Sequence, residues 1–226
     1  MDLIKQYHPG AKTVLEFGCW TGMDAERLAG CYDVVGVDVQ PHLIDYARKH
    51  RSGPEFHVGN IISARLGRTF DAVLCVGNTL SYVHEATALD AAFATFSAHA
   101  RHGTLLIIQT LLAPTIESKA CGSERIDVRG LKAAYIDRVE WCPLTQVLTT
   151  RRTWHYDDGS TEKDLLCRRV LPAPELDLRA SLAGWEVLSV ALDPPGQIGR
   201  ATGDVGCLVA RFRGETGGLG VDRVLA

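Results

Sequence analysis

Two acidic residues, Glu16 and Asp38, are spaced like the carboxylates of a nucleotide-binding site. Glu16 ends an apolar run and is followed by a glycine-rich turn that opens at Gly18. Asp38 ends the next apolar run, 20 residues after Gly18. In a strand–helix–strand unit that binds a nucleotide, an acid at this distance meets both hydroxyls of a ribose. The pair therefore predicts a site for a nucleoside-containing small molecule, although Asp38 could instead cap the helix that begins at Pro41.

The first acid, Glu16, distinguishes between the candidate cofactors. A carboxylate at the end of the first strand suits a ligand with an ammonium group, which S-adenosylmethionine has and a nicotinamide dinucleotide lacks. The glycines of the turn, Gly18 and Gly22, let backbone N–H groups and a helix N-terminus approach such a ligand closely. Because any tight turn can use two glycines, the prediction depends on the acids that accompany them.

Residues after the third and fourth strands extend the predicted site. Asn60 could bond the exocyclic amine of adenine, with Ile61 packed on the ring, or Asn60 could only form a turn. The fourth strand leads into polar residues from Asn78, and ligands of open α/β sheets lie outside the carboxyl ends of the strands. The full predicted cofactor site comprises Glu16, Gly18, Trp20, Gly22, Asp38, Val39, Asn60, Ile61, Cys75 and Asn78.

Alternating strands and helices must position these residues. The expected strands of the first half are Thr13–Glu16, Asp33–Asp38, Glu55–Val58, Phe70–Val76 and Thr104–Gln109. The expected helices between them are Asp24–Ala29, Pro41–His50 and Ala88–Ala100. Near-continuous apolar runs are typical of parallel strands that are covered on both faces. The pattern therefore predicts an α/β fold with a doubly wound, Rossmann-like sheet.

The second half changes character, and the sequence from about Ala133 to Leu171 predicts antiparallel strands. Asp158-Gly159 predicts a two-residue hairpin turn, which would pair Tyr156 with Thr161, His155 with Glu162 and Trp154 with Lys163. The chain then returns to the sheet through a helix at Pro174–Leu182 and strands at Trp185–Ala191 and Gly206–Phe212. We expect one domain over 1–226: a cofactor-binding half at 1–115, a β-rich insertion at about 116–171, the return to the sheet at 172–213 and a flexible tail at 214–226.

Four segments together resemble a known family. They are VLEFGCWTG, VVGVDVQPHLIDYAR, FHVGNI and FDAVLCVGNTLSYV, and they span about half of the chain. The sequence is similar to the class I S-adenosylmethionine-dependent methyltransferases, most of all to small-molecule N-methyltransferases of the glycine and aminosugar types. The resemblance implies S-adenosylmethionine as cofactor. It also implies a seven-stranded sheet whose last strand is antiparallel, and a β insertion that covers the substrate site.

The chain departs from the family pattern at two positions of the cofactor site. Trp20 stands where the family has the middle glycine of its turn, and Asn60 stands where the family usually has an acid. Because an indole-bearing residue adopts a positive φ only at a cost, we expect an ordinary backbone conformation at Trp20. Its side chain either lines the methionine end of the site, where cation–π attraction to a sulfonium is possible, or packs on the following helix. Only Met1–Tyr7 precede the lead-in to the first strand, where the family usually carries a longer lid.

Composition narrows the range of partners. The formal charge of −3 gives no basic surface for nucleic acid or an anionic membrane, and no apolar run is long enough for a membrane span. Seven scattered cysteines without a CxxC motif predict reduced thiols, a cytoplasmic protein and no metal site. We expect a small-molecule acceptor as the partner, and we leave a homodimer open.

The expected reaction is an in-line transfer of a methyl group, in which alignment of the attacking atom supplies much of the rate. An amine acceptor must arrive unprotonated, whereas a hydroxyl would need a firmer base, and we favour nitrogen over oxygen. The candidate catalytic residues are His84, Tyr82, His155 and Tyr7. Three of them have a non-catalytic alternative: His84 could be solvated, Tyr82 could lie in the core, and His155 could form a cross-strand charge pair. Tyr7 is a candidate only through the N-terminal tyrosines of similar proteins.

Several other functions agree less well with the sequence than methyl transfer does. A nicotinamide-dependent oxidoreductase would need G-x-G-x-x-G and would leave Glu16 unexplained. An RNA methyltransferase would carry Asn-Pro-Pro-Tyr or Asp-Pro-Pro-Tyr after the fourth strand, and a metal-dependent O-methyltransferase would carry several acids there; the chain has neither. A small-molecule O-methyltransferase and a non-catalytic S-adenosylmethionine-binding protein remain as alternatives.

Overall fold

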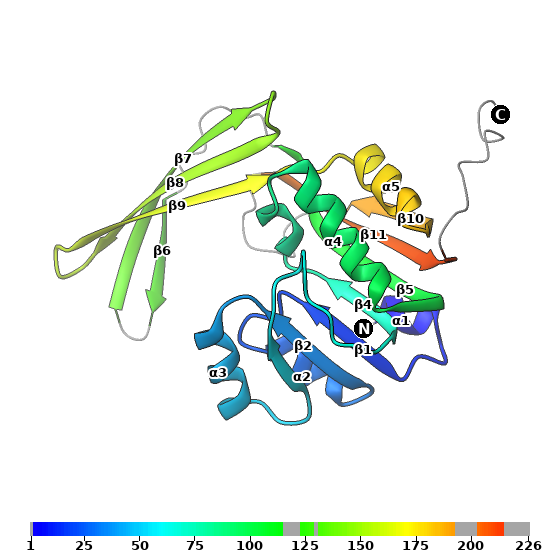
Figure 1. Ribbon diagram of the computed structural model, residues 1–226. Coiled ribbons are helices and arrows are strands. Elements are labelled where there is room, and N and C mark those ends of the chain that lie inside the picture. The colour runs from blue at the N-terminus through cyan, green and yellow to red at the C-terminus, as the bar shows by residue number, and fades with distance from the viewer. Residues whose placement is uncertain (1, 115–122, 129–130, 193–202, 215–226) are drawn as a thin grey trace.

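The chain folds around one seven-stranded sheet. The computed structural model describes residues 2–114, 123–128, 131–192 and 203–214. The strands of this sheet lie, in spatial order, as β10 (Trp185–Leu192), β11 (Gly203–Phe212), β5 (Ala100–Pro114), β4 (Phe70–Cys75), β1 (Thr13–Phe17), β2 (Asp33–Asp38) and β3 (Glu55–Val58). All neighbouring strands run parallel except β11, which is antiparallel to both β5 and β10. The predicted doubly wound sheet with an antiparallel last strand is therefore confirmed (Figure 1).

Helices cover both faces of this sheet. They are α1 (Asp2–Tyr7), α2 (Met23–Ala29), α3 (Pro41–His50), the 3-10 helix η1 (Thr79–Tyr82), α4 (Ala86–Ala98) and α5 (Ala173–Leu182). One buried cluster joins α1, α2 and α3 to the sheet through residues such as Ile4, Leu28 and Ile44. The other cluster joins α4 and α5 to the opposite face through Phe93, Phe96 and Leu176.

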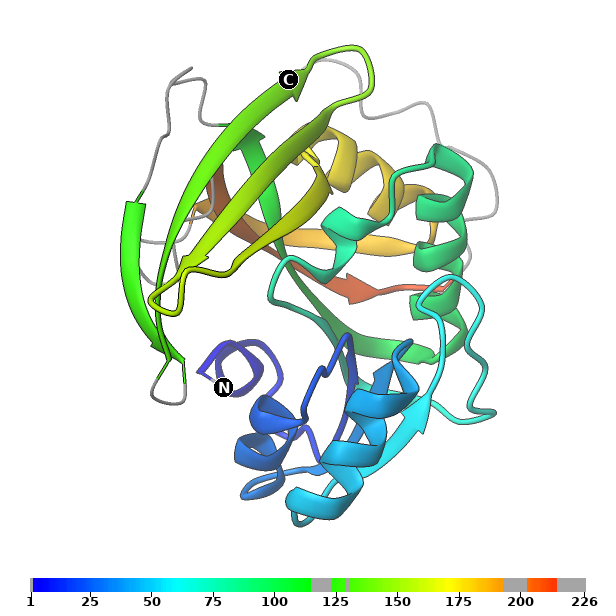
Figure 2. The same ribbon diagram turned by 90° about the vertical axis from the view of Figure 1, so that its left-hand side faces the viewer.

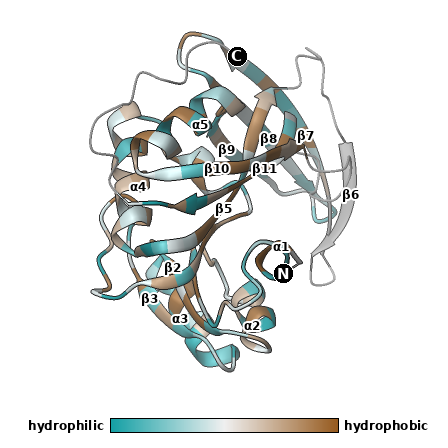
Figure 3. Cartoon of the chain, turned by 90° about the vertical axis from the view of Figure 1, so that its right-hand side faces the viewer, coloured by the Kyte–Doolittle hydropathy of each residue, from teal (hydrophilic) through white to brown (hydrophobic). Residues whose placement is uncertain are grey.

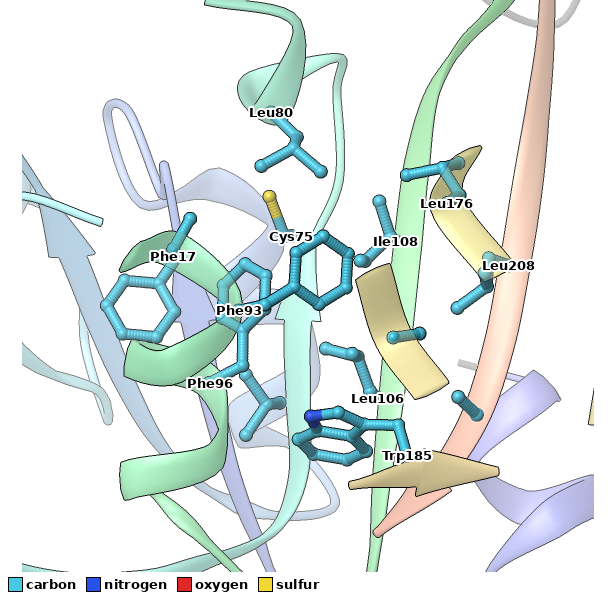
Figure 4. Packing of buried hydrophobic residues seen from close by; sticks show 14 of the residues in the cluster. Phe17, Cys75, Leu80, Phe93, Phe96, Leu106, Ile108, Leu176, Trp185 and Leu208 are labelled. Atoms are coloured by element: carbon cyan, nitrogen blue, oxygen red, sulfur yellow. The ribbon is translucent and has the colours of Figure 1, made fainter. Parts of the chain in front are cut away.

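The larger cluster fixes the end of the sheet at which the polar loops emerge. Figure 4 shows Phe93 and Phe96 of α4 packed over β4 and β5, with Leu80 of η1 directly above Cys75. Leu80 is fully buried, so it holds η1 close to the carboxyl end of β4. Hydrophobic residues also occur along β5 and β11, which are largely brown in Figure 3. These strands form the rigid base on which the loops of the site are placed.

Four antiparallel strands form a second sheet that projects from the carboxyl side of the first. They are β6 (Ser123–Val128), β7 (Leu131–Cys142), β8 (Val147–Tyr156) and β9 (Thr161–Arg169), in that spatial order. Figure 1 shows this sheet extending away from the main body, and Figure 2 shows it from its outer side. Its strand β9 contacts η1. Leu148 and Val170 at its base pack against Leu111 of β5 and Val205 of β11. The predicted β-rich insertion is present, and its antiparallel strands begin at Ser123 rather than at about Ala133.

The predicted turn at the tip of β8 and β9 was wrong. His155 pairs with Thr161, Trp154 with Glu162 and Thr153 with Lys163, so the pairing is shifted by one residue. The Asp158 carboxylate accepts bonds from the backbone N–H and hydroxyl of Ser160, at 2.8 and 2.6 Å. This side-chain contact, together with a φ of +85° at Gly159, closes a wider loop than the sequence pattern predicts.

Element boundaries agree well with the sequence in the first half. The bounds of β2, α3 and β3 match their predicted ranges, whereas β5 runs from Ala100 to Pro114 rather than from Thr104 to Gln109. The six cysteines that lie within the described ranges are free thiols, and Cys121 falls outside those ranges, as do residues 215–226 of the tail. None of the described helices has the length and apolar composition needed to cross a membrane.

Candidate functional site

A cleft of about 700 Å³ opens at the carboxyl ends of β1, β2, β3 and β4. Seven of the ten predicted cofactor residues line it: Glu16, Gly18, Trp20, Asp38, Val39, Asn60 and Ile61. Three do not line it: Gly22, Cys75 and Asn78. All three are buried next to lining residues in the sequence, and Asn78 is 7% exposed.

Glu16 is a buried acid in the lining of this cleft. It is 2% exposed, and its Oε2 is buried without a hydrogen-bond partner. Burial, with smaller contributions from Asp24 and Asp38, raises the pKa of Glu16 to about 8. A buried carboxyl that lacks a partner is costly unless a ligand supplies one. Glu16 is therefore arranged to receive a hydrogen-bond donor, and a cationic donor would also favour its charged form.

Asp38 is positioned by two backbone bonds. Its Oδ2 accepts the N–H of Trp20 at 2.9 Å and its Oδ1 accepts the N–H of Gln40 at 2.9 Å. These bonds fix the plane of the carboxylate, and each oxygen keeps a second lone pair for a ligand. The N-cap of α3 is Gln40, and no side chain caps this helix, so the structure does not support the helix-capping alternative for Asp38.

The turn after β1 contains two residues whose conformation shapes the cleft. Gly18 has a φ of +74°, and a β-carbon there would overlap the side chain of Thr79. Trp20 has a φ of +50°, so the expectation of an ordinary backbone at this residue was wrong. The bond from the Trp20 N–H to Asp38 holds the backbone in this sparsely populated region. The indole is 61% exposed at the cleft rather than buried against α2.

At the other end of the cleft, Asn60 forms a turn. Its Oδ1 accepts a hydrogen bond from the N–H of Ile62 at 3.1 Å. This bond closes a turn, which is the alternative role expected for Asn60. One Oδ1 lone pair and the amide hydrogens still face the solvent side, because Asn60 is exposed. Ile61 is half-buried beside it and lines the cleft.

The exit of β4 is held by a side chain of the neighbouring strand. Gly77 and Asn78 both have positive φ, of 67° and 63°. The side-chain Oε1 of Gln109 accepts a hydrogen bond from the N–H of Gly77 at 3.1 Å. The backbone carbonyl of Gln109 accepts one from the N–H of Asn78 at 3.3 Å. The Oδ1 of Asn78 is buried without a partner. This double turn brings Thr79 against Gly18, and Thr79 lines the cleft.

Two of the four predicted catalytic residues lie at or near the cleft. Tyr82 lines it and is 55% exposed. His84 is half-buried outside the lining, and its Nε2–H donates to the carbonyl of Cys167 in β9 at 2.9 Å. That bond fixes the neutral tautomer and leaves Nδ1 as the nitrogen that can accept a proton.

The other two predicted catalytic residues lie elsewhere. Tyr7 packs with the cluster of α1, and its carbonyl accepts a bond from Arg211, a residue paired with Leu105 near the amino end of β5. His155 is exposed, and strand alternation places it on the face of the insertion opposite to Trp154 and Tyr156. Neither residue is among the described residues that line the cleft.

The face of the insertion that carries Trp154 holds an aromatic and charged cluster. Arg152 donates to both oxygens of Asp137, at 2.7 and 2.8 Å, and lies 4.0 Å from the ring centre of Tyr135. The Trp154 N–H donates to Asp164 at 2.6 Å. Arg168 is on the same face, and its electrostatic interaction with Tyr82 links this face to the cleft. Its neighbour Arg169 instead pairs with Glu175 of α5 at 2.8 Å.

Sequence reasoning missed several lining residues. Gly77, Thr79 and Val83 lie at the exit of the fourth strand, where the sequence already predicts the ligand, but the sequence did not indicate Phe17, Cys19, Met23, Asp24, Gln40 and Leu43. Most of them are next to a predicted residue, so a rule that includes the neighbours of a ligand-binding turn would have found them. The lining as described contains three acids, Glu16, Asp24 and Asp38, and no lysine, arginine or histidine. Such a cleft attracts a cationic ligand and repels a diphosphate.

Comparison with known proteins places these features in a family context. Residues 14–103 match the family described as a methyltransferase domain. The chain is 28% identical over 109 residues to the dTDP-3-amino-3,4,6-trideoxy-alpha-D-glucopyranose N,N-dimethyltransferase of Streptomyces venezuelae, covering 48% of this chain and 46% of that protein. It is 42% identical over 77 residues to the magnesium-protoporphyrin O-methyltransferase of Rhodobacter capsulatus, covering 30% and 33%. The chain thus spans less than half the length of these curated relatives.

A solved structure extends the similarity to the whole fold. The chain superposes on SAM-bound CalS10, an amino pentose methyltransferase from Micromonospora echinaspora, with a TM-score of 0.80. The two are 25% identical, and the match covers 93% of this chain and 87% of CalS10. The predicted resemblance to class I S-adenosylmethionine-dependent methyltransferases, and among them to the aminosugar N-methyltransferases, is confirmed.

Proposed function

We propose that this relative of the class I methyltransferases transfers a methyl group from S-adenosylmethionine to an amine of a small-molecule acceptor. The observation that carries the proposal is Glu16, a buried carboxyl with an unpartnered oxygen, in the same cleft as Asp38. A ligand with an ammonium at one end and a ribose at the other satisfies both acids. The residues present therefore fit the cofactor.

Each part of the cleft has a role in holding that cofactor. Glu16 would accept bonds from the ammonium, and Asp38 would accept bonds from the ribose hydroxyls with its remaining lone pairs. Asn60 and Ile61 would contact the adenine. Gly18 lets the chain approach closely, because any larger residue would overlap Thr79. When bound, the cofactor supplies a methyl group that is activated by a positive sulfur.

The chain contributes to the reaction mainly by positioning. Tyr82 is the candidate that contacts the acceptor, because it lines the cleft and is more than half exposed. His84 is the candidate that receives the proton through Nδ1, with its ring held by the carbonyl of Cys167. Since η1 and β9 are in contact, the insertion lies beside the acceptor side of the cleft and would exclude water there. We do not assign Tyr7 or His155 a role.

Two acceptor classes follow from the relatives. The dTDP-aminosugar N,N-dimethyltransferase and CalS10 favour an amino sugar. The 42% identity to the magnesium-protoporphyrin O-methyltransferase, although over only 77 residues, keeps an oxygen acceptor as the second candidate. Nucleic acid is left out of the proposal because the chain has a formal charge of −3.

Calorimetric titration tests the cofactor part of the proposal. S-adenosylhomocysteine should bind the wild-type chain, and Asp38→Ala should abolish binding because the ribose loses its acceptors. Arg151→Gln, on the exposed face of β8, is the matched control and should bind like the wild type. Unchanged binding by Asp38→Ala would show that the ribose assignment is wrong.

A transfer assay tests the reaction itself. The chain is incubated with methyl-labelled S-adenosylmethionine and separate pools of amino sugars, other small amines and hydroxyl compounds. Label in an amine product supports the proposal, and label only in a hydroxyl product supports the O-methyltransferase alternative. Tight cofactor binding without transfer to any pool would favour the non-catalytic alternative.

A further inference from the structure

Trp20 occupies a backbone position that a bulky residue rarely adopts. Its φ of +50° lies in the left-handed region, where a glycine would have no steric cost. The bond from its N–H to Asp38 keeps the backbone there whatever the side chain is. The backbone therefore gives no reason for a tryptophan at this position, and the reason must lie in the indole.

The indole does not contribute to the core of the protein. It is 61% exposed, whereas Trp185, which packs in the core, is 2% exposed. An exposed indole gains little from burial, and its backbone conformation carries a cost. Trp20 lines the cleft instead. A ligand in the cleft is thus the partner that the indole can contact.

The charge of the cleft indicates what that ligand presents to the indole. Glu16, Asp24 and Asp38 line it without any basic side chain among the described lining residues. Glu16 accounts for an ammonium and Asp38 for a ribose. In S-adenosylmethionine the sulfur lies between these two groups and carries a positive charge. Trp20 follows Gly18 by two residues, and its backbone N–H donates a hydrogen bond to Asp38. Trp20 therefore belongs to the turn that runs between the two acids.

We propose that Trp20 recognises the charged sulfur of S-adenosylmethionine through the face of its indole, and that this contact is lost in the neutral product. The inference rests on the proposed cofactor. Indole faces attract cations more strongly than other aromatic side chains do. The chain would therefore hold S-adenosylmethionine more tightly than S-adenosylhomocysteine, and the product would leave more readily than the substrate.

The test compares the Kd values of the two ligands for the same protein by calorimetry. The ratio of the Kd of S-adenosylhomocysteine to that of S-adenosylmethionine should fall about three- to tenfold in Trp20→Leu, and less in Trp20→Phe. Trp20→Gly removes the indole and also relaxes the backbone, so it should fold at least as well and show the same fall. Because each ratio is taken within one variant, effects of the variant on folding cancel. Met23→Leu, at another exposed lining residue, is the control and should keep the wild-type ratio.

The possible outcomes separate this inference from the proposed function. If neither ligand binds the wild-type chain, the proposed function fails. If both bind and the ratio is unchanged in Trp20→Leu and Trp20→Gly, the cofactor assignment stands and the role of Trp20 is overturned. A fall of the same size in Met23→Leu would also overturn it, because the effect would then not need an aromatic ring.

Discussion

At the scale of single residues, the protonation of Glu16 links ligand binding to pH. Its pKa of about 8 means that the empty cleft holds a proton on Glu16 at pH 7. A cationic ligand favours the carboxylate, so binding at pH 7 should release up to one proton. Calorimetry in buffers with different ionisation enthalpies measures this release. The release should vanish in Glu16→Gln, and a wild-type chain that releases no proton would contradict the ammonium assignment.

The same group makes the ligand-free protein less stable at alkaline pH. The pKa of Glu16 is raised from 4.5 to about 8 in the folded chain, so the folded state binds a proton that the unfolded state has lost. Its favourable contribution is complete below about pH 4.5 and is lost as the pH rises towards 8. Glu16→Gln should raise the unfolding free energy at pH 8 by roughly 2–4 kcal/mol and change it little at pH 4. Urea unfolding at the two pH values measures this difference.

At the scale of elements, a partly buried ion pair connects strands β7 and β8 of the insertion sheet. The Asp137 and Arg152 side chains are 11% and 22% exposed, and Arg152 lies over Tyr135 and Trp154. Asp137→Asn leaves a guanidinium without its countercharge and should cost about 1–3 kcal/mol. Hydrogen exchange in β7 and β8 should accelerate, and the near-ultraviolet circular dichroism of the two aromatic residues should weaken.

The outer face of the same strands provides the control. Glu140 and Arg151 form a pair at 3.7 Å in which both side chains are more than half exposed. Glu140→Gln should therefore change stability by less than about 0.5 kcal/mol. Equal effects of Glu140→Gln and Asp137→Asn would show that burial of the inner pair does not matter.

The elements also show where sequence reasoning succeeds and where it stops. The bounds of α3 were predictable because Pro41 marks its first turn, and those of β2 because an apolar run ends in Asp38. The extension of β5 to Pro114 depends on pairing with β11, which is distant in the sequence. The hairpin register depends on the Asp158 side chain bonding to Ser160, a contact that competes with the turn the dipeptide favours.

The same limit applies to the site. The types and spacing of Glu16 and Asp38 predicted the cleft, because parallel strands end at a common edge. The positive φ of Trp20 was not predictable, since it is maintained by a bond to a residue of another strand. Strand alternation places His155 opposite to Trp154 and Tyr156, but the sequence did not indicate which face of the insertion is the outer one.

At the scale of the whole molecule, the contribution of His99 to stability is lost at acidic pH, whereas that of Glu16 is lost at alkaline pH. It is buried, its Nδ1–H donates to the Thr95 carbonyl at 2.8 Å, and its Nε2 accepts the N–H of Leu66 at 3.0 Å. Only the neutral ring can make both bonds, and burial lowers the pKa of His99. Its contribution to stability is complete above about pH 6.5 and is lost as the pH falls below that value.

A variant isolates this effect. His99→Gln keeps a donor and an acceptor but does not titrate, so the loss of stability between pH 7 and pH 5 should be smaller than in the wild type. Urea unfolding at both pH values measures this loss of stability. His102→Gln is the control, because His102 is exposed. An identical pH dependence in wild type and His99→Gln would assign the acid sensitivity to other groups.

The chain leaves the main body after β5 and returns at Val170 and Leu171, which contact Leu111, and β9 also contacts η1 and α5. None of the cleft-lining residues that the structure describes comes from the strands between these places. Mutations in the insertion can therefore accumulate without disturbing the acids of the cleft. On the proposed function, this architecture would let a lineage exchange its acceptor preference while it inherits its methyl donor unchanged.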